Sequence, residues 1–168
     1  MKEWVEALKE YKVLLGEPEK EELKRISYDS RKAEAGDLFL CMKGSKLDSH
    51  DKIPELLEKG VRLFVVEKEL EDLPAELGKT EGLSVIKVEN ARAALARLSA
   101  CYFHYPAKEM LMIGITGTKG KTTTASMVRS ILEEGGYRTG LIGTTGIDYA
   151  GIHEESRNTT PESYTLQE

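Results

Sequence analysis

Short apolar runs alternate with helically spaced segments over the first hundred residues. Apolar and β-branched clusters between turn residues indicate strands. These clusters lie at residues 26–31, 37–42, 61–66 and 84–88. Helices are expected at residues 1–11, at residues 51–59 and after Asn90, where apolar side chains recur at helical spacing. Short buried strands that alternate with helices favour a mostly parallel α/β sheet.

Turn-forming residues mark the ends of these elements. Gly60 is well placed to end the helix at residues 51–59, and Asn90 to cap the helix that follows it. Tyr105-Pro106 ends this first unit. The sequence therefore predicts two domains, residues 1–106 and residues 107–168.

The second unit begins with an apolar run at residues 110–116, which predicts a strand. A Gly/Thr/Lys loop follows, then a helix at residues 121–134 and a strand at residues 138–143. A hairpin is expected at Ala150-Gly151. Thr160-Pro161 has the pattern of a helix N-cap followed by proline in the first turn, so the chain would end as a helix begins.

Composition excludes several kinds of protein. The 168 residues carry a net charge of −5, which argues against a nucleic-acid-binding surface as the main purpose. Two cysteines without CxxC spacing make a disulfide framework improbable and fit a reducing cytoplasm. The charged N-terminus lacks the apolar region of a secretory leader, and the longest apolar run, Met110 to Ile113, is too short to enter a bilayer as a span.

The segment from Gly117 to Thr123 has the composition of a phosphate-binding loop. Glycines allow the backbone N–H groups to turn toward phosphate oxygens, and a helix N-terminus adds the positive end of its dipole. Lys121 can reach the β- and γ-phosphates, and the Thr122 hydroxyl can ligate Mg²⁺. The match to G-x-x-x-x-G-K-[ST] is imperfect, because the first glycine should stand at Ile115. The alternative is a Gly/Thr turn with two solvated lysines.

The stretch Ile115-Thr-Gly-Thr-Lys-Gly-Lys-Thr-Thr123 resembles the ATP loop of the Mur ligase family, whose usual form is T-G-T-N-G-K-T-T. Folylpolyglutamate and cyanophycin synthetases share this loop. Lys119 stands where the family usually has Asn, which adds positive charge near the phosphates.

Further stretches resemble the branch of this family that adds the third residue of the peptidoglycan stem peptide. In the first unit they are Asp29-Ser-Arg31, residues 35–39, Gly44 and residues 48–50. In the second they are Gly143-Thr-Thr-Gly146 and residues 158–163, Asn-Thr-Thr-Pro-Glu-Ser. The resemblance therefore extends from residue 26 to the end of the chain. It implies a small, mostly parallel-sheet N-terminal UDP-binding domain followed by the start of a P-loop-type ATPase domain.

The resemblance also implies roles for particular residues. Ser30 and Arg31 would meet the uridine diphosphate end of the substrate, with Lys46 and His50 as weaker candidates. The muramoyl-peptide part would be bound by Asn158, Thr159 and Thr160. The ATP loop would comprise Gly117, Thr118, Lys119, Gly120, Lys121, Thr122 and Thr123, with Lys121 as the catalytic residue and Thr122 as the Mg²⁺ ligand.

Two of these assignments have simpler alternatives. Asp29-Ser-Arg31 could be a solvated turn with a local Asx hydrogen bond. Thr160 could be only a helix cap. The histidines, among them His104 and His153, are expected to be solvated or partly buried, because none has the spacing of a metal ligand set.

The implied reaction is ATP-dependent amide formation in the cytoplasm by an enzyme that is monomeric. The D-glutamate carboxylate of UDP-N-acetylmuramoyl-L-alanyl-D-glutamate would form an acyl phosphate, and the amine of a diamino acid would displace the phosphate. Whether the diamino acid is meso-diaminopimelate or L-lysine remains open. In the family, these two are distinguished by a motif in a C-terminal domain that residues 1–168 do not include. Family members are more than twice as long, so we expect a fragment that does not catalyse the reaction alone.

Two other functions remain open. One is another ligase of the superfamily, of the folylpolyglutamate or cyanophycin type; the matches at residues 29–31 and 158–160 argue against it. The other is a non-catalytic nucleotide-binding module, which would bind UDP-sugar or ATP without turnover.

Overall fold

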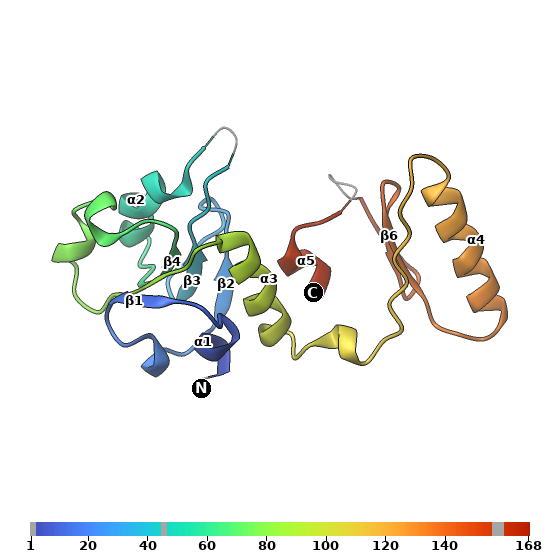
Figure 1. The fold of residues 1–168 in the computed structure, drawn as a ribbon, viewed down its shortest axis with the longest axis horizontal. Coiled ribbons are helices and arrows are strands. Elements are labelled where there is room, and N and C mark those ends of the chain that lie inside the picture. Colours follow the sequence, from blue (N-terminus) through green and yellow to red (C-terminus); the bar gives the residue numbers. More distant parts are fainter. Residues whose placement is uncertain (1–2, 45–46, 156–159) are drawn as a thin grey trace. The chain divides into compact units, whose positions relative to one another are not determined.

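The structure is a computed structural model that describes residues 3–44, 47–155 and 160–168 (Figure 1). The chain forms two compact units, Met1–Tyr105 and Pro106–Glu168. Asn158, Thr159 and Lys46, three of the residues singled out above, lie outside the described residues. No helix in the described ranges is long and apolar enough to cross a membrane.

The first unit is built on a five-stranded sheet with the order β1-β5-β4-β3-β2. The four strands from β2 to β5 are parallel, which confirms the predicted α/β class. The fifth, β1, pairs antiparallel with β5, with Lys12 opposite Lys87. The strands are β1 (Lys12–Leu15), β2 (Arg25–Ser27), β3 (Asp37–Leu40), β4 (Leu63–Val66) and β5 (Ser84–Lys87).

The helices of this unit follow the predicted pattern with shorter bounds. Asn90 caps α3, since its side-chain oxygen accepts a hydrogen bond from the Ala93 N–H at 2.9 Å. Gly60 adopts φ +86° directly after α2, a conformation that glycine reaches without steric cost. The helices are α1 (Glu3–Ala7), α2 (Ile53–Glu58) and α3 (Ala91–Tyr102), and the single-turn 3₁₀ segments are η1 (Pro18–Lys20), η2 (Ser49–Lys52), η3 (Leu70–Asp72) and η4 (Leu77–Lys79).

Both faces of the central strands are buried, which explains why they are continuously apolar in the sequence. Phe39, Phe64 and Val85 are fully buried in one cluster with residues of α2. Because side chains alternate along a strand, Leu38 and Ile86 point to the opposite face, and they too have no exposed surface. The helices α1 and α3, which both carry buried residues, lie on the side of this second face (Figure 1).

The strand β1 was not predicted from the sequence. The N-terminal helix was expected to reach residue 11, but α1 ends at Ala7 and Lys9 has a positive φ of 65°. β1 is an edge strand whose first two residues are exposed, so it has neither the burial nor the alternation that marks a strand in a sequence. Its pairing with β5, about seventy residues away, decides its conformation.

The second unit contains one long helix, α4, and a three-stranded antiparallel sheet with the order β6-β7-β8. The helix occupies the predicted residues 121–134. The predicted hairpin is present, with Ala150 (φ 47°) and Gly151 (φ 79°) both left-handed, as in a type I′ turn. The elements are η5 (Pro106–Lys108), α4 (Lys121–Glu134), β6 (Gly140–Gly143), β7 (Gly146–Tyr149), β8 (Ile152–Glu154) and α5 (Ser163–Gln167).

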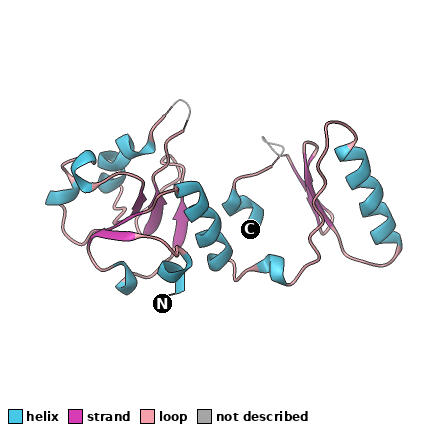
Figure 2. Cartoon of the chain, viewed as in Figure 1, coloured by secondary structure: helices cyan, strands magenta, loops and turns pink. Residues whose placement is uncertain are grey.

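Two expectations for this unit were wrong. The strand expected at residues 110–116 is absent (Figure 2), and Leu111 is 84% exposed. Apolar character alone does not make a strand, because the backbone also needs a neighbouring strand, and β6 pairs with β7 instead. Thr160 is not the cap of the last helix: α5 begins at Ser163 with Glu162 as its N-cap. The φ angle of a proline suits the residue before an N-cap as well as a residue in the first turn of a helix. Pro161 therefore did not show at which residue α5 begins.

A substitution at Gly16 can test how closely the edge strand β1 fits against β5. The φ of Gly16 is +74°, and a Cβ added there would lie 2.1 Å from the carbonyl oxygen of Leu83. We expect Gly16→Ala to lower the free energy of unfolding by at least about 2 kcal/mol, measured by chemical denaturation. Gly82→Ala is the matched control, because Gly82 has a similar φ (+68°) and open space around it. Equal losses in the two variants would contradict the proposed clash.

Candidate functional site

The loop before α4 forms an open bend at the helix N-terminus. Gly120 is the N-cap with φ +78°, and no side chain caps the helix there. This left-handed conformation favours glycine. Residues from Gly117 through Thr124 are all exposed, so nothing in the described part of the second unit covers this bend.

The first backbone N–H groups of α4 point away from the helix body. The Thr124 N–H donates to the Gly120 carbonyl oxygen at 2.9 Å and makes the first helical hydrogen bond. Helix geometry leaves the N–H groups of the three preceding residues, 121–123, without an acceptor inside the helix. These exposed donors, together with the helix dipole, form a site suited to an anion such as phosphate.

Lys121 folds back over this loop. Its Nζ donates to the carbonyl oxygen of Gly117 at 2.6 Å, so the ammonium lies at the mouth of the bend. This carbonyl is an uncharged acceptor on an exposed surface. A charged phosphate oxygen would be a stronger partner for the ammonium and would replace the carbonyl. Lys119, the departure from the family pattern, is exposed in the same loop.

The Thr122 hydroxyl has a partner that sequence reasoning did not assign to the site. Its Oγ1 lies 3.3 Å from the Oγ1 of Thr144, in the turn between β6 and β7. In the sequence, the family resemblance is what marks the stretch Gly143-Thr-Thr-Gly146, and it gives Thr144 no role at the loop. The structure brings it next to the phosphate loop because α4 packs against β6.

In the first unit, Arg31 is paired with Asp29. The guanidinium donates to both carboxylate oxygens, from Nε at 2.8 Å and from Nη2 at 2.7 Å. The Arg31 backbone N–H also donates to Asp29 Oδ1 at 3.1 Å, which is the Asx turn considered as the simpler alternative. The side-chain hydrogen bonds from Arg31 lower the pKa of Asp29 to about 2. The Arg31 side chain is nevertheless 81% exposed and can be reached by a ligand.

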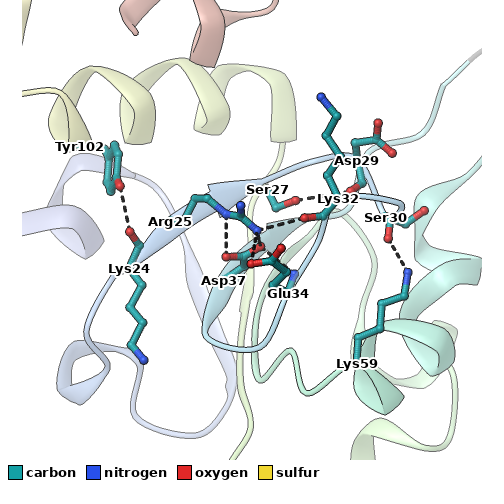
Figure 3. A network of polar contacts seen from close by, with 10 residues as sticks. All are labelled: Lys24, Arg25, Ser27, Asp29, Ser30, Lys32, Glu34, Asp37, Lys59 and Tyr102. Carbon is teal, nitrogen blue, oxygen red and sulfur yellow. Dashed lines mark hydrogen bonds and ion pairs between the residues drawn. The ribbon is translucent and has the colours of Figure 1, made fainter.

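Ser30 lies in the connection that leaves β2, with its side chain partly exposed. Its carbonyl oxygen accepts a hydrogen bond from Lys59 Nζ at 2.8 Å (Figure 3). Lys59 also pairs with Glu55 at 2.7 Å, so the turn that carries Ser30 is tied to the end of α2. This contact uses the backbone of Ser30 and not its hydroxyl.

A partly buried ion pair that sequence reasoning missed holds the same connection. Arg25 donates from Nε to Asp37 Oδ1 at 2.9 Å and from Nη2 to Oδ2 at 2.7 Å (Figure 3). Nη2 also donates to the Lys32 carbonyl oxygen at 3.0 Å, and Asp37 is only 4% exposed. The pair joins the starts of β2 and β3, opposite each other in the sheet register. An Arg and an Asp twelve residues apart give no sign of this in the sequence.

His50 is more buried than expected and is not available as a substrate ligand. It is 1% exposed; its Nε2 accepts from the Glu67 N–H at 3.1 Å, and its Nδ1 lies 2.5 Å from Asp48 Oδ1. Because Nε2 accepts a hydrogen bond, the proton is on Nδ1 and is donated to Asp48. Burial raises the pKa of Asp48, but hydrogen bonds from Lys68 and His50 outweigh it and hold that pKa below its ordinary value.

Of the remaining residues, Thr160 is exposed, three residues before α5, and makes no cap. His153 pairs with Asp148 at 2.8 Å on the outside of the antiparallel sheet. Within the described ranges, no group of three or more His, Cys, Asp or Glu side chains could hold a metal ion. A cation at the bend before α4 would therefore depend on hydroxyl and phosphate oxygens.

Two models of one protein family match the chain. The model described as "Mur ligase family, catalytic domain" matches residues 22–103, and the one described as "Mur ligase middle domain" matches residues 115–168. The chain therefore belongs to the Mur ligase family. The second match begins just before the bend at Gly117.

Curated proteins similar to this chain share one name within the family. A Clostridium botulinum protein named UDP-N-acetylmuramoyl-L-alanyl-D-glutamate--2,6-diaminopimelate ligase is 44% identical over 149 residues, which are 88% of this chain and 30% of that protein. A Clostridium perfringens protein of the same name is 42% identical over 159 residues, or 95% of this chain and 31% of that protein. The chain thus spans less than a third of the length of these relatives.

A solved structure has the same fold. A structure of a ligase with the same name superposes with a TM-score of 0.57 at 22% identity, covering 86% of this chain and 28% of that one. At this identity the likeness concerns the fold alone.

The Asp29–Arg31 pair predicts a pH-dependent contribution to stability. The pKa of Asp29 is lowered from 3.8 to about 2 in the folded protein, so its contribution is complete above about pH 4 and is lost as the pH falls through about 2. We expect Asp29→Asn to be less stable by about 0.5–1 kcal/mol at pH 7, a value reduced for the exposed guanidinium. The difference should disappear near pH 2 in thermal unfolding followed from pH 7 to pH 2. A difference that is independent of pH would contradict the ion pair, and Arg31→Met should reproduce the same profile.

Proposed function

We propose that this chain provides the UDP-substrate-binding and phosphate-binding parts of an ATP-dependent amide ligase of peptidoglycan precursor synthesis. In this reaction a diamino acid is added to UDP-N-acetylmuramoyl-L-alanyl-D-glutamate in the cytoplasm. The observation that carries the proposal is the exposed bend of Gly117–Gly120 before α4, in a chain that belongs to the Mur ligase family. The names of the relatives support this substrate and favour diaminopimelate over lysine.

The second unit would bind ATP through Gly117, Thr118, Lys119, Gly120, Lys121, Thr122 and Thr123. Backbone N–H groups at the start of α4 would meet the phosphate oxygens, since they have no acceptor in the helix. Lys121 would leave the Gly117 carbonyl and place its ammonium against the β- and γ-phosphates. Lys119 would add a second positive charge at the same bend.

The Thr122 hydroxyl fits the role of a magnesium ligand. It is exposed at the helix N-terminus beside the proposed phosphates. Mg²⁺ suits such a place because it commonly binds through one or two protein oxygens together with substrate phosphates. The bound ion would neutralise charge on the phosphate oxygens, and Thr122 would fix where it binds.

The chemistry requires positioning more than covalent help from the protein. The D-glutamate carboxylate attacks the γ-phosphorus of ATP, the bond to the β-γ bridging oxygen breaks, and ADP leaves with that electron pair. The amine of the diamino acid then attacks the acyl carbon; phosphate leaves, the amine loses a proton, and an amide remains. Lys121 and the N–H groups of α4 would stabilise the charge on the transferred phosphoryl group.

The first unit would bind the uridine diphosphate end of the substrate. Ser30 offers a partly exposed hydroxyl on a turn fixed by Lys59, and Arg31 offers an exposed guanidinium beside it. An Arg already held by Asp29 is pre-oriented, which lowers the conformational entropy lost on binding. The muramoyl-peptide part would be bound by Asn158, Thr159 and Thr160.

The proposal is tested by binding and by reconstitution. Calorimetry on the chain measures affinity for ATP with Mg²⁺ and for UDP-N-acetylmuramoyl-L-alanyl-D-glutamate. Phosphate release is then followed after fusing the chain to the remaining two thirds of the Clostridium botulinum relative. We expect release that requires both the UDP substrate and diaminopimelate. Release with folates or aspartate-arginine peptides would favour another ligase of the superfamily. Binding without release in the fusion would favour a non-catalytic module.

Lys121 provides a prediction for the ATP loop. We expect Lys121→Ala to weaken ATP binding by at least about tenfold, because a charge-assisted hydrogen bond contributes about 1.5–3 kcal/mol. Lys119→Asn is the matched control, since it removes a charge two residues away while restoring the usual family residue; its loss should be smaller. Both affinities are measured by calorimetry at fixed Mg²⁺ and salt. Equal losses would assign the effect to net charge instead of to the position of Lys121.

Ser30 provides a prediction for the UDP end. We expect Ser30→Ala to weaken binding of the UDP substrate by about 2- to 12-fold, the equivalent of one hydrogen bond worth about 0.5–1.5 kcal/mol. The backbone contact with Lys59 does not involve the hydroxyl, so the unfolding temperature should not change. ATP affinity is the internal control and should also stay constant. An unchanged affinity for the UDP substrate would remove Ser30 from the site.

A further inference from the structure

The turn between β6 and β7 holds Thr144 at the phosphate loop. Gly143 pairs with Gly146 across the hairpin, so Thr144 and Thr145 form a two-residue turn. Gly146 has φ +129°, and a Cβ there would lie 2.6 Å from the Glu154 carbonyl oxygen. The closely fitted backbone around Gly146, together with the packing of α4 on β6, fixes the place of the turn beside the start of the helix.

The two threonine hydroxyls meet across this junction. Thr122 Oγ1 and Thr144 Oγ1 are 3.3 Å apart, and either can donate. A threonine inside a helix commonly donates to the carbonyl four residues earlier in its own chain segment. Here the contact joins the helix to the neighbouring turn. Which of the two hydroxyls donates this hydrogen bond depends on whether the Thr122 oxygen binds a cation.

A hydroxyl that ligates a cation directs an oxygen lone pair to the ion and turns its hydrogen away. That hydrogen then needs an acceptor, and the groups beyond the ligand that accept it orient the ligand. The Thr144 oxygen is an acceptor in the right place. With Thr122 donating to Thr144, the lone pairs of Thr122 are left for the ion.

We propose that Thr144 is a positioning residue that fixes the Thr122 hydroxyl in the orientation needed to ligate Mg²⁺. This inference rests on the proposed function, because it requires the ATP site at α4. It adds a residue to that site and assigns it a role through Thr122, without contact to ATP. Both threonines are exposed, so the bond contributes little to folding stability, and its role is seen in the response to Mg²⁺.

The test compares Thr144→Val, which removes the hydroxyl at nearly constant shape, with Thr144→Ser, which keeps it. Amide NMR spectra of the chain, titrated with millimolar ATP in EDTA and then with Mg²⁺, follow the N–H groups of residues 117–123 and detect weak binding. In the wild type we expect Mg²⁺ to strengthen ATP binding. We expect Thr144→Val to lose about five- to tenfold of this Mg²⁺-dependent gain and Thr144→Ser to retain most of it.

The outcomes separate the two proposals. ATP affinity in EDTA should be the same in all three proteins; a loss there in Thr144→Val would mean a general disturbance of the loop and would overturn the positioning role. A wild-type Mg²⁺ response that Thr144→Val fully retains would also overturn it, while leaving the ATP site intact. If the wild-type amides of residues 117–123 do not respond to ATP at all, the proposed function and this inference are both wrong.

Discussion

The need of the backbone for hydrogen-bond partners organises both units of this protein. In the first unit, four parallel strands satisfy one another, and helices bury both faces of the sheet. In the second unit, the first N–H groups of α4 lack an acceptor because of the geometry of the helix itself. The proposed phosphate site lies where regular structure leaves donors unused, and the left-handed Gly120 keeps that place open.

The two candidate sites differ in how their charges are held before a ligand arrives. In the first unit, Arg31 is already paired with Asp29. A ligand that binds Arg31 must share the guanidinium with Asp29 or displace the carboxylate. This favours selectivity for the ligand over high affinity. At α4, Lys121 donates to the neutral carbonyl of Gly117, so an anion would gain a charged partner at small cost.

Local signals in the sequence predicted much of the fold and part of the candidate site. Asn90 caps α3 and Gly60 ends α2 as expected, because a cap depends on residues within one turn of the helix. The strands β3, β4 and β5 were predicted because burial on both faces forces an apolar run. The bend at Gly120 and the start of α4 were predicted from the same kind of local pattern, whereas the strand expected at residues 110–116 was wrong for lack of a partner.

What the sequence determined by itself is therefore the set of elements whose causes lie within a few residues: apolar runs, caps, turns and the Gly-Lys-Thr loop. Only the tertiary structure decided which distant groups meet. It paired β1 with β5, joined Arg25 to Asp37, enclosed His50 and brought Thr144 to Thr122. The physical reason is that hydrogen bonds and ion pairs act over about 3 Å in space, and separation along the chain carries no information about that distance until the sheet order and the helix packing are set.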